Sequence, residues 1–158
     1  MLRYSDLNSY LKETFGKKVY KLSLDAGFTC PNRDGTIDTR GCSFCSAGGS
    51  GEFAASRRLS ITEQIEEAKE RIQKKLPKHG EVGYLAYFQA FTNTYAPVER
   101  LRSVYEEAME APDVVALSIS TRPDCLQPEV VALLEELNRR KPIFVELGLQ
   151  TMHEESAV

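Results

Sequence analysis

Three cysteines lie close together in the first third of the chain, with eleven residues between Cys30 and Cys42 and two between Cys42 and Cys45. The two-residue gap lets Cys42 and Cys45 point at one centre, and the longer segment can return Cys30 to it. A structural zinc site is closed by four protein ligands, whereas three thiolates on a four-iron cluster leave one iron open. The spacing therefore favours an iron–sulfur cluster that can bind a further ligand.

Zinc is the alternative for these cysteines. The fourth ligand would then come from Cys125, His79 or His153. The second CxxC pair of a zinc ribbon is missing from the sequence, and Cys125 lies outside the spacing of the other three. The cluster is therefore the preferred interpretation, with Cys125 as a bystander.

Turn residues and apolar periodicity predict the elements around the cysteines. A helix over residues 7–15, capped by Ser5 or Asp6 and ended by Gly16, is predicted by an apolar face of Leu7, Tyr10, Leu11 and Phe15. A strand over residues 19–24 follows. Residues 25–51 are rich in Gly, Pro, Asn and Asp and predict a long loop, a feature that usually serves a function inside a compact domain.

The rest of the chain alternates helices with short apolar segments. Ser60 and Glu63 form a capping-box pattern at the start of a helix that ends at Pro77. Pro97 and Pro128 are placed at the first positions of two further amphipathic helices. Buried parallel strands are predicted for residues 82–91, 114–120 and 143–149.

This order of elements indicates an α/β fold with βαβ units and a parallel sheet. Ligands bind such sheets at the carboxyl ends of the strands. We therefore expect the loop of residues 25–51, called the cysteine loop, to lie at one rim of the sheet. The residues that follow the other strands should lie at the same rim, including Gln89, Thr92, Arg122 and Gln150.

The loop over residues 27–53, GFTCPNRDGTIDTRGCSFCSAGGSGEF, closely resembles that of the YtqA/YhcC-like radical SAM proteins. These in turn are similar to the radical SAM domain of the elongator catalytic subunit. The most familiar radical SAM motif has three residues between its first two cysteines, and the longer gap found here is a trait of this family. TRPD at 121–124 and VELGLQT at 145–151 extend the resemblance over essentially the whole chain.

The resemblance implies a partial (βα) barrel of the radical SAM type, here truncated after about four strands, and a [4Fe-4S] cluster on Cys30, Cys42 and Cys45. S-adenosylmethionine would chelate the open iron, and its reductive cleavage would give a 5'-deoxyadenosyl radical. The implied electron donor is of the flavodoxin or ferredoxin type. The implied substrate is tRNA, modified at the wobble uridine; radical chemistry on a small metabolite or peptide, and a zinc-stabilised binding module without catalysis, are the alternatives.

Several further residues are candidates for binding S-adenosylmethionine. Phe44 stands where the family has an aromatic residue near the adenine, the alternative being a Phe that faces the core. Gln89 and Thr92 end the second strand, where the glycines and glutamate usual in the family are absent. Ser120 could reach the ligand from the third strand, or serve only in packing.

Charged residues after the third and within the fourth strand complete the candidate site. Arg122 could contact the cofactor carboxylate or a substrate phosphate, and a salt bridge to Asp124 is the alternative. Glu146 lies in an apolar run, where an unpaired carboxylate is costly to bury. With Gln150 on the same side of the strand, it could address ribose hydroxyls or the amino group, unless it forms an ion pair with Arg122.

Composition places the chain among ordinary globular proteins, with 42% hydrophobic and 27% charged residues. No run approaches the about 18 apolar residues that span a bilayer, and no export signal precedes the cysteines, so we expect a cytoplasmic protein without disulfides. Residues 1–58 hold nine Lys and Arg against six Asp and Glu, a local excess that could attract a polyanion. The chain stops at Val158, just past the fourth predicted strand, so we expect a longer protein with further strands.

Overall fold

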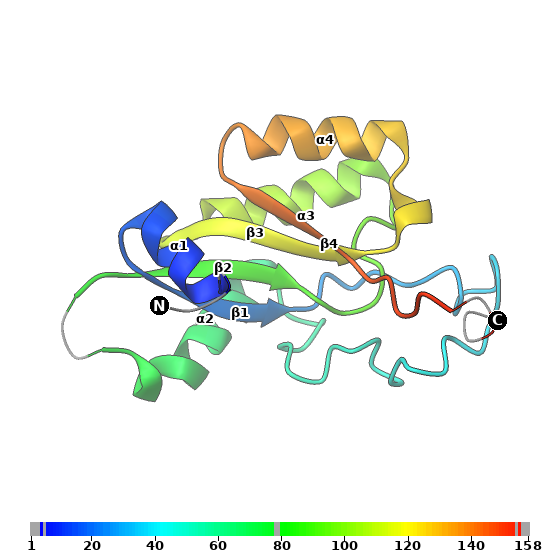
Figure 1. Cartoon of the computed structure of the whole chain (residues 1–158), viewed down its shortest axis with the longest axis horizontal. Coiled ribbons are helices and arrows are strands. Elements are labelled where there is room, and N and C mark those ends of the chain that lie inside the picture. Colours follow the sequence, from blue (N-terminus) through cyan, green and yellow to red (C-terminus); the bar gives the residue numbers. More distant parts are fainter. Residues whose placement is uncertain (1–3, 5, 78–79, 154, 156–158) are drawn as a thin grey trace.

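Four parallel strands form one sheet in the structure, a computed structural model that describes residues 4, 6–77, 80–153 and 155 (Figure 1). They follow chain order across the sheet: β1 (Lys18–Leu24), β2 (Val82–Phe88), β3 (Val114–Thr121) and β4 (Ile143–Leu147). Helix α1 (Leu7–Phe15) precedes β1, and the strands are connected by α2 (Ile61–Ile72), α3 (Val98–Glu110) and α4 (Pro128–Asn138). The predicted α/β fold with a parallel sheet is therefore confirmed.

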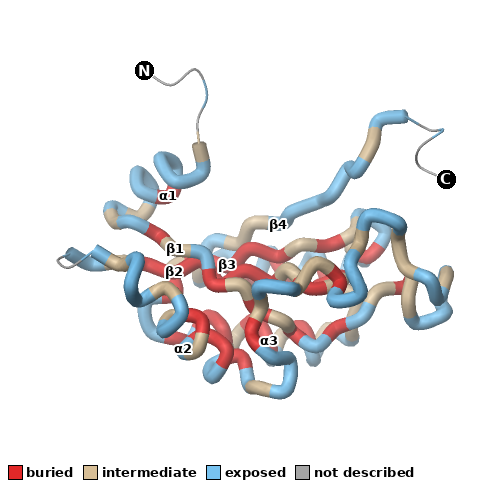
Figure 2. Tube along the Cα trace, turned by 90° about the horizontal axis from the view of Figure 1, so that it is seen from below, coloured by how far each residue is buried: buried red, intermediate tan, exposed pale blue. Residues whose placement is uncertain are grey.

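The two faces of the sheet have different coverings. Helices α2, α3 and α4 pack on one face, where alternate strand residues join the helices in the main core. Its fully buried side chains include Leu22, Ile65, Phe88, Tyr105 and Leu117. On the other face, Leu11 of α1 packs in a smaller cluster with Val19, Leu85 and Ala116. Figure 2 shows α1 on the side of the sheet opposite α2 and α3. The main core therefore lies between the sheet and helices α2, α3 and α4, with a smaller buried cluster on the other face.

Local sequence signals account for the helix starts. Ser60 and Glu63 form the predicted capping box: the Glu63 N–H donates to Ser60 Oγ over 3.2 Å, and the Ser60 N–H donates to Glu63 Oε2 over 2.8 Å. Asp6 caps α1 by accepting from the Ser9 N–H, while Ser5 lies outside the described residues. Pro128 takes the first position of α4, as predicted.

Several predicted boundaries are wrong by a few residues. Pro97 is the N-cap of α3 and not its first residue, because its ψ of 142° is extended. Helix α2 ends at Ile72 and continues only as a 3-10 turn at Gln73–Lys75. Strand β2 ends at Phe88 and not at residue 91, because Phe91 has left the strand with a left-handed φ of 62°.

Strand β4 departs most from the sequence prediction. It ends at Leu147, two residues early, and its side chains are largely exposed, with Leu147 at 50%. The strand lies at the edge of the sheet, so its apolar side chains lack the second strand neighbour that β2 and β3 have.

Within the described ranges, no helix is both long and apolar enough to cross a membrane.

The capping box gives a test of the fold itself. Ser60→Ala is expected to lower the free energy of unfolding by about 1 kcal/mol, because it removes the acceptor for a helix N–H that has no partner within the helix. Urea denaturation followed by circular dichroism measures this difference. The same substitution at Ser103, exposed within α3, should leave stability unchanged or raise it slightly; equal losses at both positions would contradict the assigned role of the cap.

Candidate functional site

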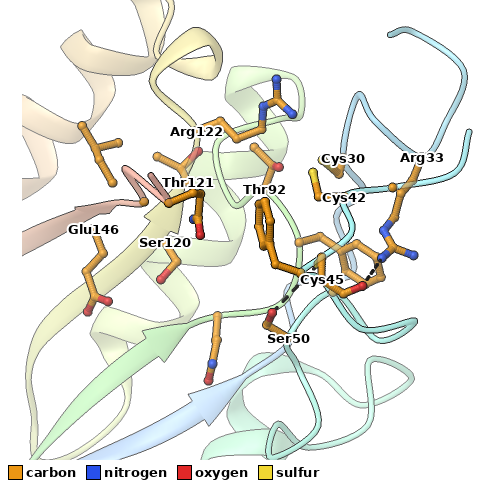
Figure 3. Close-up of a pocket in the computed structure, with 18 of the residues that line it drawn as sticks. Cys30, Arg33, Cys42, Cys45, Ser50, Thr92, Ser120, Thr121, Arg122 and Glu146 are labelled. Atoms are coloured by element: carbon orange, nitrogen blue, oxygen red, sulfur yellow. Dashed lines mark hydrogen bonds between the residues drawn. The ribbon is translucent and has the colours of Figure 1, made fainter. Parts of the chain in front are cut away.

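A pocket of about 480 Å³ opens at the carboxyl ends of the strands, beside the loop that follows β1 (Figure 3). The loops after all four strands contribute to its wall, as the strand order predicts. All ten residues proposed from the sequence line it: Cys30, Cys42, Phe44, Cys45, Gln89, Thr92, Ser120, Arg122, Glu146 and Gln150. The fold therefore brings together the residues that the sequence singled out.

The three loop cysteines are partly exposed free thiols on this wall. Asn32 Nδ2 donates a hydrogen bond to Cys42 Sγ over 3.1 Å, and Cys45 Sγ lies 3.9 Å from Ser50 Oγ. Across the part of the chain that the structure describes, no three Cys, His, Asp or Glu side chains converge closely enough to hold a metal ion. The thiols share a pocket without forming a closed ligand set.

The cysteine loop is built from short backbone turns. The Arg33 N–H donates to Cys30 O over 2.8 Å, and the Cys45 N–H donates to Cys42 O over 3.0 Å. Between these turns, the Arg33 guanidinium donates to the backbone carbonyls of Cys45 and Ser46 over 3.3 and 2.6 Å. The turn after Cys30 and the segment that follows Cys42 are thereby linked through the Arg33 side chain.

Arg122 forms the salt bridge to Asp124 that the sequence offered as the alternative. Its guanidinium donates to both carboxylate oxygens, over 2.9 and 2.7 Å, in the short 3-10 turn at Pro123–Cys125. This hydrogen bonding lowers the pKa of Asp124 and raises the pKa of Arg122. The pair fixes a permanently charged guanidinium at the pocket wall.

Glu146 has different partners from those predicted. Its carboxylate accepts a hydrogen bond from Ser118 Oγ and lies 4.0 Å from Lys21 Nζ. The alternative of an ion pair with Arg122 is wrong: Glu146 pairs with Lys21, and Arg122 pairs with Asp124. Glu146 is exposed on the edge strand β4 of this chain, so its carboxylate is not the buried group that the apolar run predicts.

The remaining candidates occupy varied positions on the pocket wall. Phe44 is 63% exposed, so the alternative of a core-facing side chain is wrong. Thr92 is buried, whereas Gln89 is half-buried and Gln150 is exposed with a left-handed φ of 60°. Ser120 Oγ donates to the Tyr87 hydroxyl over 3.0 Å, which gives it a polar partner beyond simple packing.

Sequence reasoning missed several residues that line the pocket, among them Arg33, Tyr87 and Phe91. Tyr87 had a usable signal, because side chains alternate along a strand and Tyr87 stands two residues before Gln89. Burial is the main cause of the raised pKa of its phenol, to which Glu146 adds. Arg33 and Phe91 had no such signal, since their contacts join segments that are distant in the sequence.

The side chains proposed for a zinc site are not gathered with the loop cysteines. Cys125 is buried and lines a separate pocket, and burial raises the pKa of its thiol. His153 is exposed beyond β4, and His79 lies outside the described residues. The structure therefore offers none of the described candidates as a fourth ligand in place.

Comparison with known proteins finds relatives over nearly the whole chain. The chain is 54% identical to YtqA of Bacillus subtilis over 156 residues, or 99% of its own length. It is similar to YtqA and YhcC. Identity to YhcC of Escherichia coli K12 is 42% over 147 residues, and identity to MJ0486 of Methanocaldococcus jannaschii is 33% over 157 residues. These names state no activity.

The matched regions cover 48% of YtqA, 45% of YhcC and 46% of MJ0486. The chain thus spans about half the length of the curated relatives it matches. No family model and no solved structure matches it.

Proposed function

We propose that this chain belongs to a radical SAM enzyme and that its pocket binds a [4Fe-4S] cluster together with S-adenosylmethionine. The main support is that three free thiols of one loop face a single pocket at the carboxyl ends of a parallel sheet. Thiolate sulfur is the ligand of such clusters, and three ligands leave one iron open. The donor set therefore fits the group in its chemistry, and the C-x11-C-x2-C spacing of the sequence agrees with it.

Bound there, the cluster would supply the electron that cleaves S-adenosylmethionine into methionine and a 5'-deoxyadenosyl radical. The residues of the chain would bind the cluster and orient S-adenosylmethionine. Cys30, Cys42 and Cys45 would hold the cluster. Arg122 donates to Asp124 through Nε and Nη2, so its remaining N–H groups would bind a carboxylate or phosphate group, while Glu146 would offer acceptor oxygens to hydroxyl or amino groups.

Anaerobic reconstitution with ferrous iron and sulfide tests this proposal. We expect about four iron and four sulfide per chain, as the cluster formula requires, with the visible absorbance of a thiolate-ligated cluster. With dithionite and S-adenosylmethionine, the loaded protein should release 5'-deoxyadenosine. Binding of one zinc ion without sulfide would instead support the zinc-stabilised module.

For the substrate we propose tRNA, modified at the wobble uridine. The support from the chain is the excess of basic residues around the cysteines, since residues 1–58 hold nine Lys and Arg against six Asp and Glu. Binding of tRNA should then weaken steeply as salt increases, because neutralised phosphates release counterions. Absence of binding at low salt would favour a small metabolite or a peptide.

Asn32 should tune a cluster held by Cys42. Its Nδ2–H donates to Cys42 Sγ, and hydrogen bonds to the sulfurs help to set the potentials of iron–sulfur clusters. Asn32→Asp replaces this donor with a carboxylate, so we expect a lower reduction potential in a redox titration followed by electron paramagnetic resonance. Asn32→Leu removes the donor without adding charge and should give a smaller shift in the same direction. Unchanged potentials in both variants would contradict the assignment.

A further inference from the structure

Phe91 is an unusual residue on the pocket wall. It follows β2 with a φ of 62°, in the left-handed region that bulky side chains rarely occupy. Its N–H donates to Gly49 O over 2.9 Å, which links the end of β2 to the last turns of the cysteine loop. A strained residue persists only where its surroundings hold it, so the contacts of Phe91 are informative.

The ring of Phe91 meets both ends of the cysteine loop. Gly49 packs so closely that a Cβ at this position would lie 2.6 Å from two ring atoms. The guanidinium carbons of Arg33 and Arg57 lie 5.6 and 5.2 Å from the ring centroid, within the range of cation–π attraction. One aromatic ring thus contacts three separate segments of the chain.

Each arginine also holds backbone carbonyls of the loop. Arg33 donates to the carbonyls of Cys45 and Ser46, whereas Arg57 donates to Phe28 O over 2.8 Å. Phe28 lies two residues before the first loop cysteine, so the two guanidiniums secure the loop at its start and near its end. Both guanidiniums lie against the same ring, and Arg57 also pairs with Asp25 Oδ1 over 3.4 Å.

We infer that Phe91 is the positioning residue of the cysteine loop, and that with Arg33 and Arg57 it forms a clamp that sets where Cys45 lies relative to Cys30. The clamp is made of contacts within the chain and needs no bound group. What the loop then binds rests on the proposed function, but the clamp itself does not.

Hydrogen exchange in the metal-free chain tests the clamp directly. The amides to follow are those of Cys45, Gly49 and Ser50, which donate to Cys42 O, Ser46 O and Ser46 Oγ. In Phe91→Ala we expect these amides to exchange about fivefold to thirtyfold faster, because both cation–π contacts and the contact with Gly49 are lost. Amides within α2 and α3 should exchange as before.

Matched variants separate the clamp from general packing. Phe53→Ala removes an 80% exposed ring close in sequence to the cysteine loop, and Arg40→Ala removes an arginine whose side chain pairs with Asp38. Neither should change exchange at residues 45–50, whereas Arg33→Ala should accelerate it. Phe91→Trp keeps an aromatic face for the guanidiniums and should restore part of the protection. A merely apolar role would instead be rescued equally by Phe91→Leu.

Two outcomes would overturn the clamp: unchanged exchange at residues 45–50 in Phe91→Ala, or faster exchange throughout the core, which would make Phe91 an ordinary core residue. Iron and sulfide content after reconstitution is measured separately on the same proteins. If the unmodified chain takes up no iron while Phe91→Ala still loosens the loop, the proposed function fails and the clamp stands. If iron is incorporated while exchange is unaffected by Phe91→Ala, the clamp fails and the function stands.

Discussion

Cys30→Ala is expected to lose nearly all of the iron and sulfide that the unmodified chain incorporates under anaerobic reconstitution. A cluster held by three thiolates loses a third of its protein ligands, and no described Cys or His side chain is gathered beside the other two thiols to replace it. Iron and sulfide assays on purified protein measure the effect, and release of 5'-deoxyadenosine should disappear with them. The same losses are expected for Cys42→Ala and Cys45→Ala.

Cys125→Ala is the matched control for these variants. Its thiol is buried in another pocket, beside Asp124, so its removal should leave the iron content unchanged. If Cys30→Ala kept its full complement of iron, the assignment of the cluster to this loop would be wrong. If Cys125→Ala lost iron as well, the ligand set would have to include a thiol that the spacing motif does not contain.

The architecture was predictable because local patterns and topology agree in this chain. Capping residues fix the starts of α1 and α2, and the alternation of strands and helices leads to a parallel sheet. The exposure of β4 was not predictable, because the sequence of an apolar segment shows its hydrophobicity but not how many strands lie beside it in the sheet. The end of β2 was missed for a related reason: the left-handed turn at Phe91 depends on Gly49, far earlier in the chain.

The candidate site was predictable where its residues lie close in sequence or follow strand ends. The salt bridge of Arg122 with Asp124 spans two residues, and the cysteine spacing is visible directly. The contact of Glu146 with Ser118 depends on the pairing of β3 with β4, which sequence patterns alone do not fix. The loop contacts of Arg33 depend on how the turns after Cys30 and Cys42 are folded against each other.

The three thiols line one pocket on a loop without regular secondary structure. A loop that binds a metal group loses conformational freedom, so part of the free energy of binding is spent in ordering the loop. Contacts that hold the loop near its bound arrangement reduce this cost. The packing of the loop against Phe91 should therefore matter for occupancy as well as for local stability.

Gly49→Ala should disturb this packing more than the loss of a flexible contact would. The new Cβ would overlap the Phe91 ring, and the φ of 62° at Gly49 is unfavourable for any other residue. The left-handed backbone costs about 1–2 kcal/mol and the steric overlap a further 1–3 kcal/mol. We expect a loss of this size in the free energy of local opening, measured by hydrogen exchange at residues 45–50.

Two comparisons separate the steric effect of Gly49→Ala from its backbone effect. Gly27 lies in the same loop with a φ of 73° and has nothing within 4 Å of an added Cβ, so Gly27→Ala should show the backbone cost alone. In a Phe91→Ala background, the ring is absent, and Gly49→Ala should become as mild as Gly27→Ala. The double-mutant cycle then gives a coupling energy of about 1–3 kcal/mol, as expected for residues in contact. A coupling near zero would mean that the ring and Gly49 act independently, and the steric account of this glycine would fail.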